Sequence, residues 1–225
     1  MNDLRAAALP SKEQIQALPR FQNLPAQNIQ VIQNLAQCRA IEAELKTAAL
    51  LGFDTESKPT FSKGEIATGP HLIQLATHER AYLFQVSDDI LDFLKPVFAS
   101  RGQIKAGFGL KNDAHLFRKK GIELHNVIEL SKCFSAFGFT HPMGLKNAMA
   151  LLFQVNFPKS KKISTSNWAR KILTPHQIEY AAADAYAPVL VFEELLRLGL
   201  LPKTMTRHLF KLGMQSNTIK AETDA

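Results

Sequence analysis

The feature that most constrains this chain is an apolar run, Ala48 to Phe53, that delivers two carboxylates, Asp54 and Glu56, shortly before Pro59. The apolar side chains predict a buried strand, and residues two apart in a strand lie on the same face. Two acids side by side at the end of a buried strand combine like-charge repulsion with loss of hydration, so they need a compensating cation. The pair alone leaves two interpretations open, a solvated strand end and a metal site.

The order of the expected elements predicts an α/β fold. Runs with a period of two predict an antiparallel hairpin over residues 71–77 and 80–86. After the hairpin, strands alternate with helices, which favours parallel connections, so we expect a mixed sheet of five to six strands flanked by helices. The other expected strands are 29–32, 103–108 and 126–130, and the expected helices are 35–47, one capped by Asp88 and ending near Ala99, 110–120, 144–152, and one over 174–199 capped by Thr174.

Composition divides the chain into three parts. Residues 1–28 alternate prolines with Gln- and Asn-rich pieces, a pattern that breaks helices and predicts a loosely attached arm. Residues 29–200 are expected to form one domain, and residues 201–225 a helix followed by a polar tail. We expect no membrane span, since no run approaches about 18 uncharged apolar residues. Because Cys38 and Cys133 follow no disulfide or metal spacing, the expected compartment is the cytoplasm.

Two later segments carry further residues suited to chemistry. A strand ends at Gly107 and Gly109, and Asp113 follows in the first turn of a helix. These glycines lack the third glycine of a dinucleotide fingerprint. The alternative interpretation of Asp113 is an ordinary acid in the first turn, where the helix dipole stabilises a negative charge. Tyr180 and Asp184 lie four apart on one helix face, separated by three alanines that allow close approach of a backbone or a substrate. Helix-packing alanines are the alternative interpretation.

In chain order, Asp54 and Glu56, Asp113, and Tyr180 with Asp184 form a pattern far more specific than its parts. With this pattern the chain resembles the DEDD superfamily of 3′-5′ exonucleases in its tyrosine subtype, the group that contains ribonuclease D and the Werner syndrome exonuclease domain. The resemblance spans roughly residues 38 to 198, and its other supporting segments are 53–59, 71–76, 107–113, 144–147 and 166–168.

The resemblance implies a ribonuclease H-like fold and a metal-dependent 3′-to-5′ exonuclease that releases nucleoside 5′-monophosphates from a free 3′ end. It also implies two divalent cations, Mg²⁺ or Mn²⁺, held by four carboxylates. Asp54 would bridge both ions, Glu56 and Asp184 would complete the site that activates water, and Asp113 would hold the second ion. Tyr180 would orient the water, because a phenol with a pKa near 10 is a poor base at neutral pH.

The substrate is less closely defined. The net charge of +7 favours a polyanionic partner, and the candidate contacts are Ser57, Lys162, Trp168 and Arg170. A solvated loop is the alternative for the basic residues, and packing is the alternative to base stacking for the single tryptophan.

One departure from the family pattern is Glu129, where Asp is usual, outside the catalytic set. DNA is slightly favoured over RNA, because the chain leaves no room for the C-terminal helical domains of ribonuclease D. Ribonuclease D-like RNA trimming and an inactive nucleic-acid-binding module are the alternatives.

Overall fold

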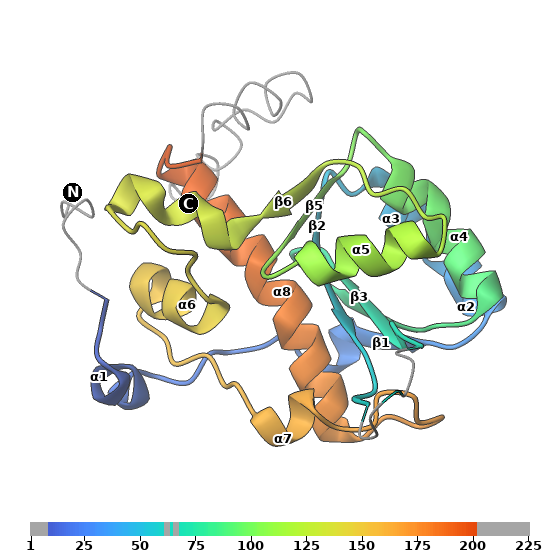
Figure 1. Cartoon of the computed structure of the whole chain (residues 1–225), viewed down its shortest axis with the longest axis horizontal. Helices are drawn as coiled ribbons and strands as arrows, with labels where there is room; N and C mark the ends of the chain where they lie inside the picture. The colour runs from blue at the N-terminus through green and yellow to red at the C-terminus, as the bar shows by residue number, and fades with distance from the viewer. Residues whose placement is uncertain (1–8, 61–63, 65–67, 202–225) are drawn as a thin grey trace, which may run out of the picture.

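A mixed sheet lies between two layers of helices (Figure 1). The computed structural model describes residues 9–201 except 61–63 and 65–67, so the predicted C-terminal helix and tail lie outside the described residues. The sheet has six strands in the order β1-β4-β3-β2-β5-β6. The strands are β1 (Ile29–Ile32), β2 (Leu50–Glu56), β3 (Leu72–Ala76), β4 (Ala81–Gln85), β5 (Ile104–Gly107) and β6 (Val127–Glu129).

Strand directions follow the connections between the strands. β2, β3 and β4 pair antiparallel, which confirms the predicted hairpin. β5 joins β2 in parallel and β6 joins β5 in parallel, because a helix intervenes before each of them and carries the chain back to the same end of the sheet. β1 lies at the edge, parallel to β4. The predicted mixed sheet is therefore confirmed, and β2, which carries the acid pair, is one of its central strands.

The helices divide between the two faces of the sheet (Figure 1). One face packs against α6, α8 and the 3-10 helix η3, and the other packs against α2, α3, α4 and α5. Successive β2 residues alternate between the two cores, as the period of a strand requires. The helices are α1 (Lys12–Ala17), α2 (Leu35–Ala40), α3 (Glu42–Thr47), α4 (Asp88–Ala99), α5 (Lys111–Lys119), α6 (Leu145–Phe153), α7 (Lys161–Ser164), α8 (Pro175–Arg197) and the 3-10 helices η2 (Ala26–Asn28) and η3 (Leu130–Phe137). No helix among the described residues is long and apolar enough to cross a bilayer.

Two helix predictions are wrong in detail. The single helix expected over 35–47 is interrupted at Ile41, whose backbone leaves the helical region at φ −109° and ψ 1° while its side chain is buried. The helical spacing of the apolar residues thus continues across a break in the helix. α4 is capped by Ser87, whose side chain accepts a hydrogen bond from the Ile90 amide, and Asp88 is the first helical residue. At that position its charge still complements the helix N-terminus.

The expectation of a helix-breaking, loosely attached arm is wrong for the described part of residues 1–28. Pro10 and Pro19 flank α1 instead of interrupting it, and a capping box at Ser11 starts the helix. The Phe21 amide then donates to the Asn156 carbonyl over 3.0 Å, which ties the segment to the chain after α6. The buried side chains of the segment are Ile15, Phe21 and Leu24. Whether the chain divides at residues 28 and 200 remains a prediction.

Candidate active site

Three carboxylates meet at the carboxyl end of β2. Asp54 and Glu56 occupy alternate positions of this strand, and Asp184 reaches them from α8, which covers the same face. One oxygen from each of the three side chains lies within 4.8 Å of the others. Asp184 is almost fully buried, whereas the two strand acids are half-buried. The structure thus brings together three of the four predicted metal ligands.

A close contact between α8 and β2 makes this meeting possible. Gly52 lies two residues before Asp54, and a Cβ atom placed on it would come within 1.8 Å of the Ala185 carbonyl oxygen. The helix contributes small side chains to the same contact, because Ala181, Ala182 and Ala185 are fully buried. The absence of a side chain on Gly52 lets the helix backbone at Ala185 approach the strand, which agrees with the expectation that small residues in this helix allow close approach of a backbone.

Tyr180 lies one turn before Asp184 on α8, and its hydroxyl favours the ionised form of the Asp184 carboxyl and so lowers its pKa. Burial raises the pKa of Tyr180 far above its usual value, and the negative charges of Asp184 and Glu56 raise it further. The phenol therefore stays protonated at any working pH. On its other side the ring contacts Trp168, with 6.1 Å between ring centroids.

The buried carboxyl of Asp184 is an unfavourable anion in the ion-free protein. Burial raises its pKa to about 6, although the Tyr180 hydrogen bond and the positive charge of Lys159 act in the opposite direction. A cation that binds between the three acids would remove this penalty.

This pKa predicts how stability depends on pH. Because the folded-state pKa of Asp184, about 6, exceeds the value of 3.8 for an unperturbed Asp, the native protein binds a proton before the unfolded chain does. The penalty is therefore complete above pH 6 and disappears as the pH falls toward 4. In EDTA, Asp184→Asn should melt about 4 °C higher than the wild type at pH 7, and the difference should shrink toward pH 4.

Thermal unfolding followed by circular dichroism at several pH values measures this difference. Glu79→Gln, at an exposed position in the turn between β3 and β4, is the matched control and should follow the wild type at every pH. If the difference in melting temperature between Asp184→Asn and the wild type did not change with pH, the buried carboxyl would carry no such penalty.

A cleft of about 310 Å³ opens onto the acids. Glu129 shapes its wall, because one carboxylate oxygen accepts from the Gly109 amide at 2.9 Å and the other from the Leu110 amide at 2.8 Å. Sequence analysis placed Glu129 outside the catalytic set and missed this role, although an acid in the expected strand over 126–130 was visible. The residues lining the cleft are Asp54, Phe108, Gly109, Ser131, Pro142, Met143, Gly144, Leu145, Lys159 and Asp184.

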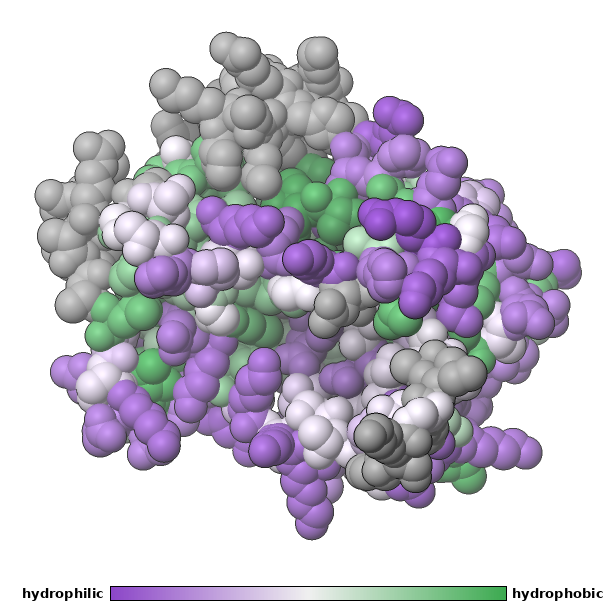
Figure 2. All heavy atoms as spheres, viewed as in Figure 1, coloured by the Kyte–Doolittle hydropathy of each residue, from purple (hydrophilic) through white to green (hydrophobic). Residues whose placement is uncertain are grey.

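The other predicted site residues fall into different environments. Asp113 belongs to the first turn of α5, which follows the end of β5, but its side chain lies outside the described part of the structure. Ser57 directly follows β2 and packs closely on Gly69, where an added Cβ would come within 2.1 Å of the serine Oγ. Lys162 is exposed on α7. Figure 2 shows hydrophilic residues along the lower edge of the molecule, where Figure 1 places α7.

Arg170 and Trp168 lie in the loop that joins α7 to α8. Arg170 is exposed, and its carbonyl accepts a hydrogen bond of 2.9 Å from the Gln85 side chain at the end of β4. This contact fixes the backbone of the loop and leaves the guanidinium in solvent. Trp168 has no exposed surface, and its indole N–H donates to the Ser164 carbonyl over 3.1 Å. Packing, the alternative considered for Trp168, accounts for this environment.

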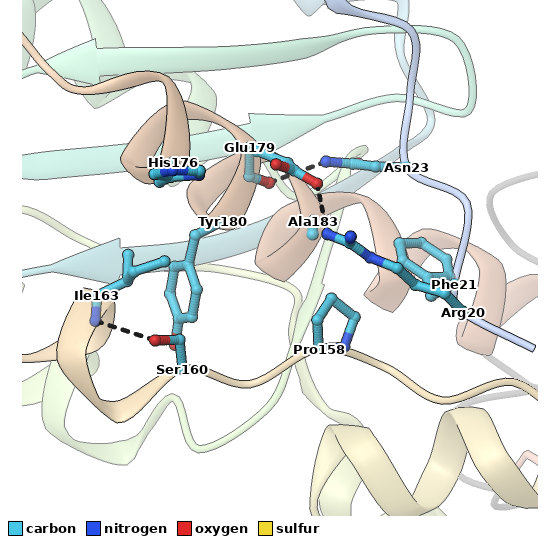
Figure 3. Close-up of a pocket in the computed structure, with 10 residues that line it drawn as sticks. All are labelled: Arg20, Phe21, Asn23, Pro158, Ser160, Ile163, His176, Glu179, Tyr180 and Ala183. Carbon is cyan, nitrogen blue, oxygen red and sulfur yellow. Dashed lines mark hydrogen bonds and ion pairs between the residues drawn. The ribbon is translucent and has the colours of Figure 1, made fainter. Parts of the chain in front are cut away.

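The N-terminal segment holds the helix turn that carries Tyr180 (Figure 3). Arg20 forms an ion pair with Glu179 at 2.9 Å, and the Asn23 side chain donates to the Glu179 carbonyl at 2.8 Å. Between this segment, the chain before α7 and the helix lies a cavity of about 180 Å³ that reaches the Tyr180 ring. Sequence analysis missed these contacts because the proline-rich segment carries no periodic pattern.

Removing the anchor of this segment should lower stability. Phe21 is 7% exposed, and its ring packs on Phe157 with centroids 5.1 Å apart. Phe21→Ala should therefore lower the free energy of unfolding by about 3 kcal/mol, measured by urea denaturation. Leu9→Ala, at an exposed position of the same segment, should change it by less than about 0.5 kcal/mol. Equal effects of the two substitutions would mean that the segment is attached as loosely as its sequence predicted.

Comparison with known proteins decides the family. The profile of the 3′-5′ exonuclease family matches residues 29–199. The chain belongs to this family. It is 29% identical over 170 residues to the bifunctional 3′-5′ exonuclease/ATP-dependent helicase WRN of Mus musculus, a match that covers 71% of the chain and 12% of the relative. The Aedes aegypti exonuclease mut-7 homolog is 26% identical over 199 residues, 76% of the chain and 27% of the relative.

The chain spans between 12% and 50% of the length of the curated relatives it matches. Membership nevertheless confirms the predicted DEDD-type exonuclease family, because the matching region contains the β2 acid pair and the α8 pair.

Solved structures confirm the ribonuclease H-like fold of the chain. The Nibbler EXO domain of Aedes aegypti superposes with a TM-score of 0.68 at 20% identity and covers 87% of this chain and 100% of that one. Escherichia coli RNase D gives a TM-score of 0.63 at 22% identity and covers 85% of this chain and 52% of that one. Trypanosoma brucei RNase D in complex with RNA U12 gives a TM-score of 0.68 at 16% identity, and the match covers 97% of this chain and 78% of that one.

Proposed function

We propose that this chain is a metal-dependent 3′-to-5′ exonuclease of the tyrosine subtype, which releases nucleoside 5′-monophosphates from the 3′ end of a nucleic acid. The observation that carries the proposal is the cluster of Asp54, Glu56 and Asp184 oxygens within 4.8 Å, with Tyr180 one helical turn before Asp184 on α8. The match of residues 29–199 to the 3′-5′ exonuclease family supports it.

The donor set fits hard divalent cations. Three clustered carboxylates, one of them buried with a raised pKa, offer the oxygen ligands that Mg²⁺ and Mn²⁺ prefer. Asp54 would bridge two ions, Glu56 and Asp184 would hold the ion nearer the attacking water, and Asp113 would supply the fourth carboxylate. Two such ions, when bound, acidify water and stabilise the attacking and leaving oxygens of an in-line displacement.

The other residues of the site would position the attacking water and the substrate. Tyr180 keeps its proton, so it acts as a donor that orients the attacking water and does not remove a proton from it. Trp168 packs behind the Tyr180 ring and limits the directions in which the phenol can point. Lys159 lines the cleft close enough to Asp184 to lower its pKa, and its ammonium can meet a phosphate there.

The proposed substrate is a nucleic acid with a free 3′ end. Ser57, beside the acids, is the proposed contact of the terminal nucleotide, and Lys162 and Arg170 are proposed contacts of phosphates. DNA is the first candidate, as the sequence analysis expected. RNA is the second, favoured by the similarity to a ribonuclease D solved with RNA U12. The cytoplasm remains the proposed compartment, which two free buried cysteines support.

End-labelled DNA and RNA oligonucleotides of matched sequence, incubated with the protein and Mn²⁺, test the proposal. Mononucleotides should appear from the 3′ end, and EDTA should stop their release. Binding of the oligonucleotides without release at any Mn²⁺ concentration would favour an inactive binding module. Release that is unchanged in Asp184→Asn would contradict the proposed site.

A further inference from the structure

Gln74, in the middle of β3, is buried without a partner. Its side chain has no exposed surface, and neither its oxygen nor its nitrogen has a hydrogen-bond partner among the described residues. An unpaired buried amide destabilises a protein, so such groups are rare and call for an explanation. Gln103 shows the usual situation, since its buried amide donates to the backbone oxygens of Leu45 and Ala48.

The register of the sheet places Gln74 next to the acids. Gln74 pairs directly with Asp54 across the antiparallel β2 and β3. Residues paired in this way project to the same face, with Cβ atoms about 4.5–5.5 Å apart. α8 covers that face, because Gly52 on the same side of β2 packs against Ala185. The unpaired amide therefore lies beneath the helix that carries Asp184, beside the predicted bridging ligand.

The neighbours of Gln74 on β4 offer its amide no hydrogen-bond partner. On β4 it lies opposite Leu83, which is apolar. The diagonal neighbour Gln85 already uses its oxygen with a nearby glutamine and its nitrogen with a backbone carbonyl. On β2 the polar neighbours are the carboxylates of Asp54, directly opposite, and Glu56, on the diagonal. Asp54 is thus the acceptor best placed for the Gln74 amide.

We propose that Gln74 is a positioning residue for the metal site, whose side-chain N–H donates to the Asp54 carboxylate when that carboxylate turns to hold divalent cations. This inference rests on the proposed function. Carboxylates that ligate metals are usually held by a second hydrogen bond, and loss of that partner weakens metal binding. In the ion-free protein the Gln74 amide stays unpaired, which lowers the free energy of unfolding. In the ion-bound protein the same amide holds the Asp54 carboxylate in place.

Gln74→Met, which keeps an unbranched side chain of similar size, tests both consequences. In EDTA the variant should melt about 2–4 °C higher than the wild type, because an unpaired amide has been removed. Its Kd for Mn²⁺, measured by calorimetric titration without nucleic acid, should rise about 10-fold. Gln74→Leu should give the same two results.

Gln103→Met is the matched control, because it removes a buried glutamine whose amide is paired and which lies outside the cleft. It should lower the melting temperature and leave the Mn²⁺ affinity unchanged. Equal Mn²⁺ affinity in Gln74→Met and the wild type would overturn the inference and leave the proposed function standing. A wild type that binds no Mn²⁺ would overturn both. Loss of folding in both Gln74 variants would overturn the inference, since it expects a gain in stability.

Discussion

Asp54→Asn should lower the rate of nucleotide release by about 10³-fold or more while the protein stays folded. One oxygen of Asp54 lies within 4.8 Å of oxygens of both Glu56 on its own strand and Asp184 on the facing helix, so under the proposed function it is the carboxylate that would bridge the ions. An amide oxygen carries no charge and cannot bridge two cations in the same way. The substitution also removes one of three clustered negative charges, so the ion-free protein should melt at a higher temperature than the wild type.

Single-turnover release of the labelled 3′ nucleotide at saturating Mn²⁺ measures the rate, and thermal unfolding in EDTA measures the stability. Asp92→Asn is the matched control, because this acid is exposed on α4 in the opposite helix layer and pairs with Lys95 at the surface. Its rate should stay within about twofold of the wild type. If Asp54→Asn released nucleotides at a rate within tenfold of the wild type, the assignment of Asp54 as a metal ligand would be wrong.

Gly52→Ala should damage stability and activity together. The added methyl group would lie 1.8 Å from the Ala185 carbonyl oxygen and 2.9 Å from a Val189 methyl group. Backbone cannot move aside locally, so α8 must shift away from β2, which should lower the free energy of unfolding by about 3 kcal/mol. Because the same helix carries Asp184 and Tyr180, a shift of about 1 Å should also slow nucleotide release about 100-fold.

Urea denaturation and the nucleotide-release assay, run at a temperature where the variant is folded, separate the two effects. Gly102→Ala is the control, since an added Cβ there meets nothing closer than the Ser100 hydroxyl at 3.9 Å. That variant should match the wild type in both measurements. If Gly52→Ala lost stability but kept full activity in its folded fraction, the helix–strand contact would not set the position of the acids.

Local patterns predicted much of the fold. The strand at β2, the hairpin of β3 and β4, and the start of α8 at Thr174 and Pro175 were all visible in the sequence. Each of them depends on side chains close together in the chain, such as alternating apolar residues or a capping hydroxyl. The break at Ile41 was not predictable in this way, because the apolar residues on either side of it keep the helical spacing.

The site was predictable in its parts and not in its assembly. Spacing placed Asp54 with Glu56 and Tyr180 with Asp184, whereas only the family resemblance indicated that the two pairs meet. Contacts over so many residues depend on how α8 crosses the sheet, which no short segment encodes. The role of Gln74 was hidden for the same reason, since it follows from strand register and from a helix contributed by a distant part of the chain.

The separation of Asp54 and Asp184 in the chain has a thermodynamic consequence. Because strand and helix form the cation site together, a chain that has lost either element has no site, and the ions bind the native state alone. For each ion that binds, every tenfold rise in free ion above its Kd would then add about 1.4 kcal/mol to the free energy of unfolding. If the proposed function holds, the supply of divalent cation sets how long the chain stays folded as well as how fast it turns over, and chelation should make the protein more sensitive to proteolysis.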